Sequence, residues 1–196
     1  GAGVALVRRG DGHELVLKVR PGSGWAPQLA RAARLGDRVR APDHPVPRHV
    51  DAGVGRGVSW SLQERLPGEV PPSMSAAHAG QLLGLLRHHR DVAADLVDAA
   101  APAHERHEVD RALVRLSRRP DTAALAGDLI AVLRRRRRHD LPLRTGDVVH
   151  GGYGPGHYLA VGDRVTGVVA WEGAGVGDWR ADLVGLACRA SWAPEQ

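Results

Sequence analysis

The chain begins with two short apolar runs separated by a polar turn, a pattern typical of paired strands. Residues 4–9 and 14–19 are rich in Val and Leu, and Gly10-Asp11-Gly12 between them is a hairpin turn signal. Residues 26–35 then carry apolar positions at helical spacing, with Pro27 near the first turn, where proline is tolerated. We therefore expect a β-hairpin followed by a helix.

From Ser75 onward the pattern becomes helical, and Ser75 is a suitable N-cap. The apolar positions that follow fall close to one stripe: Ala79, Leu82, Leu83, Leu85 and Leu86. Val92, Leu96 and Val97 continue the apolar pattern until Pro102 interrupts it. Two more helices are expected over residues 104–116 and 121–136, the second capped by Asp121.

Near the C-terminal end, two β-branched runs bracket a glycine-rich loop. The first run includes Val148 and Val149, the second Val168 and Val169, and a turn with Glu172 follows. Loops of this kind place side chains at the mouth of a cleft, where chemistry is usually done. We expect the functional site here.

Composition narrows the class of protein. A chain of 196 residues with 43% hydrophobic content can bury a core as one domain or two small lobes. No apolar run approaches the ~18–20 residues that span a bilayer, and no secretory signal pattern is present. The single cysteine, Cys188, excludes an internal disulfide and fits a reducing cytoplasm. The absence of an initiator Met allows for trimmed first residues.

The net charge of +5 invites a nucleic-acid interpretation, which the distribution of charge does not favour. Basic residues are scattered, and only 4% of the chain is aromatic. The one basic block, residues 134–138, follows an apolar helical pattern and is interpreted as a solvated helix end, with an anionic partner as the alternative. Histidines 88, 89, 104 and 107 lack a second ligand cluster, so helix-surface polarity is preferred to a zinc site.

The composition also points to a biased codon usage in the source organism. Lys18 is the only lysine, and neither Asn nor Phe occurs. Because these residues need A/T-rich codons, we expect a high-G+C bacterium as the source.

The glycine-rich loop and the run after it resemble the catalytic centre of the aminoglycoside phosphotransferase family, bacterial small-molecule kinases with a protein-kinase-like fold. The family pattern is H-G-D-x-x-x-x-N, then a strand ending in D-W-E or D-F-E. His150-Gly151 and Trp171-Glu172 match this pattern. The positions of the loop Asp, the loop Asn and the metal-binding Asp hold Gly152, His157 and Ala170.

The resemblance extends over most of residues 4–188. It places Lys18 at the position of the phosphate-pairing lysine of a kinase small lobe. In the family a Glu of the following helix pairs with this lysine, but here no Asp or Glu occurs between Val19 and Gly36. Gln28 is the nearest substitute, and a neutral amide cannot hold an ammonium as a carboxylate does. Residues 45–53 resemble the family's segment leading into the fourth strand, and residues 58–68 its fifth strand and hinge. The last matching segment contains Asp178 and Asp182, which the resemblance makes structural, with Asp182 bracing the catalytic loop.

The fold implied by the resemblance is α+β and bilobal. Residues 1–68 would form an N-lobe with a small antiparallel β-sheet, one helix and a hinge at about 59–68. Residues 69–196 would form a mainly helical C-lobe with the loop–strand pair at 147–172. Relative to the family, the chain looks truncated at both ends.

Residue by residue, the resemblance implies a loss of phosphoryl transfer. A positioned base contributes typically ~10²–10⁴-fold in rate, and Mg²⁺ prefers hard oxygen ligands to imidazole. We therefore expect neither ATP nor Mg²⁺ as a cofactor, and no metal site. Lys18, Glu64 and Glu172 remain as candidates for substrate or nucleotide binding in the inter-lobe cleft.

The remaining candidates for catalysis are His150, Tyr153, His157 and Tyr158. Histidine titrates near neutrality and tyrosine can donate to a developing oxyanion, a set that suits metal-free elimination, addition or cyclisation. The alternative is that His150 braces the loop and the tyrosines pack.

Three functions stay open for the whole chain. The first is a cytoplasmic protein reused in bacterial natural-product or peptide metabolism, which binds a peptide or small molecule in the cleft. The second is a non-catalytic pseudokinase subunit with a protein partner or an oligomeric state, and the third is a residual ATP-dependent phosphotransferase.

Overall fold

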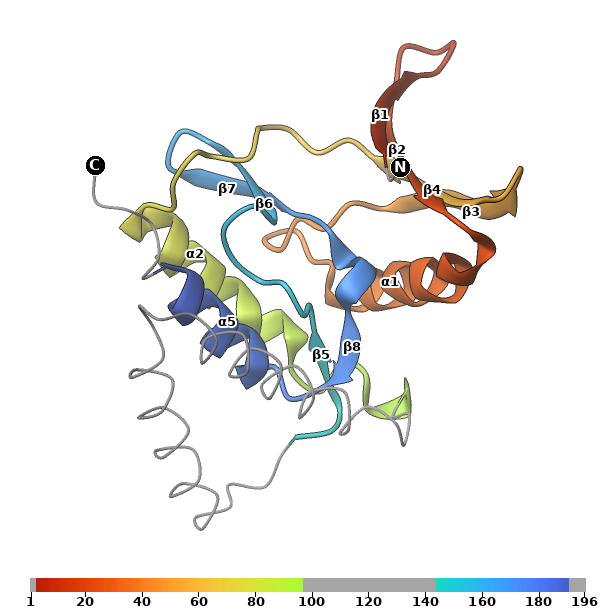
Figure 1. Cartoon of the computed structure of the whole chain (residues 1–196). Coiled ribbons are helices and arrows are strands. Elements are labelled where there is room, and N and C mark those ends of the chain that lie inside the picture. Colours follow the sequence, from red (N-terminus) through yellow and green to blue (C-terminus); the bar gives the residue numbers. More distant parts are fainter. Residues whose placement is uncertain (1–2, 97–143, 191–196) are drawn as a thin grey trace, which may run out of the picture.

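The computed structural model describes residues 3–96 and 144–190, and the fold is given for these residues (Figure 1). It is a mixed α+β structure, as predicted, with an antiparallel sheet in its N-terminal part. The expected helices over residues 104–116 and 121–136 lie outside the described residues, as do His104, His107 and the basic block 134–138. No helix in the described ranges is long and apolar enough to cross a membrane.

The N-terminal sheet has four strands in the order β1-β2-β4-β3. They are β1 (Gly3–Arg8), β2 (Glu14–Pro21), β3 (His49–Gly55) and β4 (Val58–Glu64), and every neighbouring pair is antiparallel. The predicted hairpin of β1 and β2 is confirmed. β2 runs two residues further than expected, because β4 continues to pair with it as far as Pro21.

Helix α1 (Ala26–Val39) follows the short 3₁₀ turn η1 (Ser23–Trp25) and contacts β3 and β4. Pro27 lies in its first turn, as predicted. The helix extends four residues beyond the expected end, because its buried stripe continues at helical spacing. The buried residues are Leu29, Ala32, Leu35, Gly36 and Val39.

Helix α2 (Ala76–Leu85) is capped by Ser75, whose Oγ accepts the His78 backbone N–H at 3.1 Å. Leu82, Leu85 and Leu86 are buried, but the inclusion of Leu83 in the apolar stripe is wrong, since 47% of it is exposed. Leu83 lies roughly 100° round the helix from Leu82, away from the core.

After α2 the chain forms the 3₁₀ turns η2 (Leu86–His89) and η3 (Ala94–Leu96) in place of a longer helix. Asp91, between them, has a left-handed backbone (φ 59°) that no α-helix accommodates. Val92 and Leu96 still pack against the hydrophobic core. The apolar pattern therefore continues beyond α2, while the helix does not.

The C-terminal part contains two small sheets and helix α5 (Arg180–Ala190), which lies beside α2 (Figure 1). β5 (Asp147–Val149) pairs with β8 (Gly175–Gly177), and β6 (Tyr158–Val161) pairs with β7 (Arg164–Val168). The turn η4 (Trp171–Gly173) connects β7 to β8. These elements put the glycine-rich loop, residues 150–157, between β5 and β6, as the sequence predicts.

Candidate functional site

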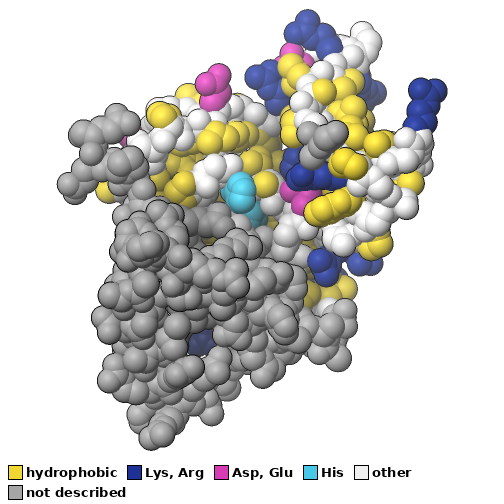
Figure 2. Space-filling view, viewed as in Figure 1, with side chains coloured by type: hydrophobic (Ala, Val, Ile, Leu, Met, Phe, Trp, Pro, Cys, Tyr) yellow, Lys and Arg dark blue, Asp and Glu magenta, His cyan; other side chains and the backbone are white. Residues whose placement is uncertain are grey.

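A cleft of about 580 Å³ opens between the N-terminal sheet and the β6–β7 hairpin. Figure 2 shows hydrophobic side chains on its walls, with a basic and an acidic side chain in contact beside them. Its charged lining residues are Lys18, Arg20, Glu64, Arg65 and Glu172. The three candidates for substrate or nucleotide binding are therefore all on its surface.

Lys18 is paired with Glu172 across this cleft. Lys18 Nζ lies 2.6 Å from Glu172 Oε1, and the two side chains are only 13% and 10% exposed. Burial alone would raise the pKa of Glu172, but the Lys18 ammonium outweighs it and holds that pKa below its ordinary value. The carboxylate partner that α1 does not supply thus comes from η4, 154 residues later in the chain.

Glu64 ends β4 and is exposed at the rim of the cleft. Its backbone N–H donates to the Arg48 carbonyl at 2.8 Å, which anchors the strand end. Glu64 is thus an exposed residue, unlike the enclosed Glu172.

The start of the glycine-rich loop is held by Asp182 of α5. Its Oδ2 accepts the His150 backbone N–H at 2.6 Å, and its Oδ1 accepts the Gly151 N–H at 3.0 Å. Asp182 is 2% exposed, so these charge-assisted bonds are shielded from water. Gly151 has φ +78°, and a Cβ there would lie 2.7 Å from the Gly173 carbonyl oxygen, so this position requires glycine.

His150 is fully buried, and both of its ring nitrogens have partners. Nε2 lies 2.8 Å from the Val169 carbonyl, to which it donates, while Nδ1 accepts the Gly152 N–H at 3.2 Å. Burial lowers the pKa of His150 to about 4, so the ring is neutral at pH 7. The His150 ring thus links the glycine-rich loop to Val169, the residue that follows β7.

His157 is only partly buried and has a different environment. Its Nδ1 lies 2.6 Å from the Gly152 carbonyl oxygen, and since a carbonyl only accepts, Nδ1 carries a proton and donates it to this oxygen. Within residues 3–96 and 144–190, no hydrogen bond to Nε2 is found. Among the described residues, His150 thus has partners for both ring nitrogens, whereas His157 has one for Nδ1 alone.

Gly152 and His157 occupy space that only one side chain can fill. A Cβ at position 152 would lie 2.6 Å from His157 Nδ1 and 2.8 Å from its Cε1. Real Cβ atoms do not approach other atoms so closely, so any larger residue at 152 requires the imidazole to move. The imidazole thus stands where a side chain at position 152 would begin.

Tyr153 and Tyr158 are both 1% exposed and lie in the core. The Tyr153 hydroxyl donates to the Leu82 carbonyl at 3.0 Å, and the Tyr158 hydroxyl lies 3.2 Å from His78 Nδ1. Burial raises the pKa of both hydroxyls. Neither is among the cleft-lining residues.

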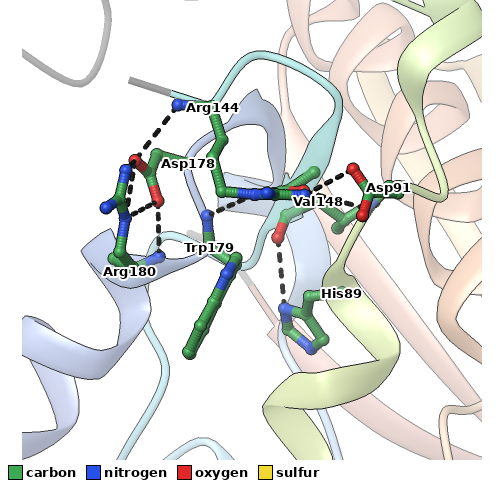
Figure 3. A network of polar contacts seen from close by, with 8 residues as sticks. His89, Asp91, Arg144, Val148, Asp178, Trp179 and Arg180 are labelled. Atoms are coloured by element: carbon green, nitrogen blue, oxygen red, sulfur yellow. Dashed lines mark hydrogen bonds and ion pairs between the residues drawn. The ribbon is translucent and has the colours of Figure 1, made fainter. Parts of the chain in front are cut away.

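Asp178 belongs to a polar network that joins β5, β8 and α5 (Figure 3). It accepts the Arg180 backbone N–H at 3.0 Å and pairs with the Arg180 side chain. Asp147, fully buried, pairs with Arg144 at 2.7 Å and accepts the Asp91 backbone N–H at 2.8 Å. Burial would raise the pKa of Asp147, but the Arg144 hydrogen bond leads the effects that lower it. Sequence reasoning missed this pair, because Asp147 begins the short strand β5 with no local motif to mark it.

Two buried histidines, His44 and His89, form a second group that the sequence did not indicate, with the partly exposed His88 beside them. His44 and His89 have no exposed surface, and their ring centroids are 5.3 Å apart; His88 stacks on His44 at 5.4 Å. The interpretation of His89 as helix-surface polarity is wrong, because η2 turns it inward against Trp171. Burial lowers the pKa of His44 to about 3, and its Nδ1 donates to the Val39 carbonyl at 2.9 Å.

Ala170 lines the cleft with a left-handed backbone (φ 67°, ψ 48°), which is unfavourable for alanine. Its methyl side chain offers no metal ligand, and His157 offers imidazole, which Mg²⁺ binds poorly. No group of three His, Cys, Asp or Glu side chains in the described ranges is placed to hold a metal ion. These residues do not fit the Mg²⁺ site that a kinase-like fold implies.

The profile of the phosphotransferase enzyme family (APH) matches residues 1–196, the whole chain. The chain belongs to this family. No curated protein matches it in a sequence comparison. The membership explains the retained geometry of the loop and of the strand that follows it.

Solved structures of family members support the fold. An aminoglycoside-3′-phosphotransferase of type VIII is 27% identical with a TM-score of 0.62, covering 96% of this chain and 73% of that one. Macrolide 2′-phosphotransferase MphH from Brachybacterium faecium is 24% identical with a TM-score of 0.57, covering 92% of this chain and 65% of that one. A thermostable mutant of the aminoglycoside phosphotransferase APH(4)-Ia, in a ternary complex with ADP and hygromycin B, is 16% identical with a TM-score of 0.55, covering 98% of this chain and 74% of that one.

This chain therefore spans about two thirds of these relatives, 65% of MphH and 73% of the type VIII enzyme. The kinase-like fold is confirmed. The division into lobes at residue 68 stays a prediction.

Proposed function

We propose that this phosphotransferase-family protein no longer transfers phosphoryl groups. In this proposal it binds a peptide or small molecule in the cleft, within bacterial natural-product or peptide metabolism in the cytoplasm. Neither ATP nor Mg²⁺ takes part. The observation that carries the proposal is the contact between Gly152 and His157.

That contact supports the proposal, because the His157 ring stands where a side chain at position 152 would begin. The family's acceptor-activating Asp corresponds to Gly152, and the imidazole of His157 fills the adjoining space. A positioned base is typically worth ~10²–10⁴-fold in rate. With Ala170 at the metal-binding position, the groups needed for charge neutralisation in phosphoryl transfer are also replaced.

Where the protein carries out a reaction, we assign the proton transfer to His157, which is not itself among the cleft-lining residues but whose backbone carbonyl accepts the N–H of the cleft-lining Val169. Its Nδ1–H donates to the Gly152 carbonyl, which orients the ring and leaves the Nε2 lone pair available. His150 braces the loop, because its two nitrogens already bond to protein groups. Tyr153 and Tyr158 pack the core beneath the loop in the same proposal.

A phosphotransfer assay tests the loss of function directly. The purified protein is incubated with ATP, Mg²⁺ and panels of aminoglycosides and macrolides, with an active family member as the positive control. We expect no ADP release above the protein-free blank. Mg²⁺-dependent phosphorylation that disappears in Lys18→Met would overturn the proposal, since a contaminating kinase would not respond to that substitution.

The role of His157 is tested in the source cell. A deletion strain is complemented with the wild-type gene, with His157→Asn or with His157→Gln, and its metabolites are compared by mass spectrometry. Asn can keep the hydrogen bond to Gly152 but cannot exchange a proton, so we expect both variants to lose the product. Full restoration by His157→Asn would refute proton transfer by this residue.

A second candidate function is that of a non-catalytic partner subunit. The observation that favours it is the edge strand β1, where Val4 is 72% and Leu6 54% exposed on the same face. A partner could cover this face. Co-purification of a stoichiometric partner from the source cell, lost in a Val4→Lys, Leu6→Lys variant, would support this role; elution as a lone monomer would count against it.

A further inference from the structure

The strand β4 carries polar residues on its buried face. Ser59, Ser61 and Gln63 alternate along the strand and are buried, whereas the apolar residues between them are only half-buried. A strand that packs on a core normally has the opposite pattern, with its apolar residues inside. Such departures are expected where a protein binds a ligand. The buried face of β4 is therefore a candidate surface for ligand recognition.

Of these three residues, Gln63 lies on the cleft. It lines the cleft together with Val16, its directly paired neighbour in β2. Paired residues of adjacent strands present their side chains on the same face of a sheet, so the Gln63 side chain lies on the cleft face. Gln63 is 5% exposed, and it is the one uncharged polar residue among the described residues that line the cleft.

The side-chain amide of Gln63 has no hydrogen-bond partner within residues 3–96 and 144–190. Its two cross-strand neighbours do not supply one. Val16 is apolar, and His49, paired with Gln63 in β3, has a buried Nδ1 that itself lacks a partner. An amide offers two N–H donors and one acceptor oxygen, and buried polar groups of this kind are nearly always paired. The cleft is the side from which a partner can reach Gln63.

A ligand at this end of the cleft displaces the water that hydrates the Gln63 amide. A carboxamide or lactam group restores both hydrogen bonds at once, because it carries a donor and an acceptor side by side in one plane. A ketone only accepts, so it leaves the Gln63 oxygen unpaired and loses affinity. Sites built around a buried hydrogen-bonding group discriminate strongly against analogues that lack the matching group.

The walls around Gln63 fit the rest of an organic ligand. The cleft has a volume of about 580 Å³, within the range of small-molecule pockets. Its apolar lining favours a ligand by removing apolar surface from water. Lys18 and Arg20 keep their charges on the same lining and can bind an acidic group elsewhere on the ligand. The role of Gln63 does not depend on the net charge of that ligand.

We propose that Gln63 is a specificity-determining residue of the cleft and pairs with a carboxamide or lactam group of the ligand. The inference rests on the proposed function in one respect, since it takes the cleft as the ligand site. It adds the functional group by which the ligand is recognised. Peptides carry this group in Asn and Gln side chains and in amidated ends, and small molecules carry it in lactam rings.

Two probes that share one ring system test the pairing. 2-Naphthamide and 2-acetylnaphthalene have the same rings and the same carbonyl group, and differ in an NH₂ group against a methyl group. Titrations followed by the NMR signals of each probe give the two affinities. We expect the wild-type protein to bind the amide about tenfold more tightly, the scale of one additional hydrogen bond.

Gln63→Met is the decisive variant, because Met keeps the length of the side chain and removes the amide. We expect the ratio of the two affinities to fall from about ten to about one, through weaker binding of the amide. Gln28→Met is the matched control. It removes another amide whose oxygen is buried without a partner, but Gln28 does not line the cleft, so the ratio should stay unchanged.

Thermal unfolding separates recognition from a structural role. If the Gln63 amide is unpaired in the free protein, Gln63→Met should leave the midpoint Tm unchanged or raise it, since Met buries no polar group. A lower Tm would show that the amide has a partner inside the protein and would overturn the proposal. Val70→Trp, at a cleft-lining position that is 49% exposed, should weaken both probes by narrowing the cleft.

Competition against bound 2-naphthamide distinguishes the two sources of the group. N-acetylasparagine methylamide represents a peptide and caprolactam a small lactam, and the stronger competitor gives the source. The proposal is overturned if neither competes, if the wild-type protein binds both probes equally, or if the ratio is unchanged in Gln63→Met. Adenosine that binds wild type and Gln63→Met equally tightly would also overturn it, because the cleft would then recognise its ligand without Gln63. Phosphoryl transfer is decided separately by the phosphotransfer assay, whatever the probes show.

Discussion

Mildly acidic pH should destabilise this protein through two buried histidines. Burial lowers the pKa of His44 to about 3 and that of His150 to about 4. In the unfolded chain both return to about 6.5. Because the folded pKa is the lower one, the unfolded state takes up protons first as the pH falls. The stability that these groups provide is therefore full above the unfolded pKa and declines as the pH drops from about 6.5 toward the folded values.

The size of the effect follows from proton linkage. Between about pH 7.5 and about pH 5.5, each unfolded histidine becomes mostly charged while its folded counterpart stays neutral, which lowers the free energy of unfolding by about 1.4 kcal/mol per residue. The two together give about 3 kcal/mol, a large share of a typical stability of about 5–15 kcal/mol. The burial of His49, which lowers its pKa, acts in the same direction.

Carboxylates contribute little in this window. The pKa values of Asp147 and Glu172 lie below their ordinary values, because Arg144 and Lys18 outweigh the opposing effect of burial. Unfolded carboxylates titrate near about 4, so both states stay ionised above about pH 5.5. The loss of stability over this range therefore reports on the histidines.

Urea unfolding, followed by circular dichroism at the two pH values, measures the effect. His44→Asn removes the titrating ring but keeps a donor near the Val39 carbonyl. It should reduce the pH-dependent loss by about 1.4 kcal/mol. A total loss below about 0.5 kcal/mol, or an equal loss in His44→Asn, would refute the linkage argument.

Three further substitutions test the loop by urea unfolding. Gly152→Ala should lower the free energy of unfolding by about 1–3 kcal/mol, because its Cβ meets the imidazole, and most of this cost should vanish in a His157→Ala background. Ala170→Gly should raise it by about 0.5 kcal/mol, because glycine accepts the left-handed backbone. Asp182→Ala should lower it by about 2–5 kcal/mol, because the backbone N–H groups of His150 and Gly151 both lose their acceptor, at about 1–3 kcal/mol each.

Each of these has its own control. If Gly152→Ala lowers the free energy of unfolding as much in the His157→Ala background as in the wild-type protein, the clash lies with another residue. For Ala170→Gly, the comparison is Ala160→Gly on β6, where glycine should destabilise as it does in most strands. For Asp182→Ala, Asp182→Asn keeps one acceptor and should cost less; equal costs would show that the charge, rather than the hydrogen bonds, holds the loop.

Local structure was largely predictable. Two apolar runs separated by Gly10-Asp11-Gly12 predict the β1–β2 hairpin, and Ser75 predicts the start of α2. Both depend on residues within a few positions of each other. Prediction was poorer where the local pattern is ambiguous: Leu83 fits an apolar run but points outward, and Asp91 breaks a helix without any proline or glycine.

The candidate site was predictable only as a list of residues. Sequence comparison with the family motif singles out Gly152, His157 and Ala170, but it does not show that the first two share one space. It also treats His150 and His157 alike, as two histidines of one loop. Their difference depends on burial and on which ring nitrogens have partners.

The amino-acid sequence by itself determined where the strands lie and where the helices begin. It also showed that His150-Gly151 and Trp171-Glu172 match the family motif, while positions 152 and 170 carry no acidic group. Only the tertiary structure decided the partner of Lys18, since Glu172 is 154 residues away. It likewise decided the burial of His44 and His89 and the position of the His157 ring. Periodicity and turn signals act over a few residues, whereas these contacts form only when distant segments pack together.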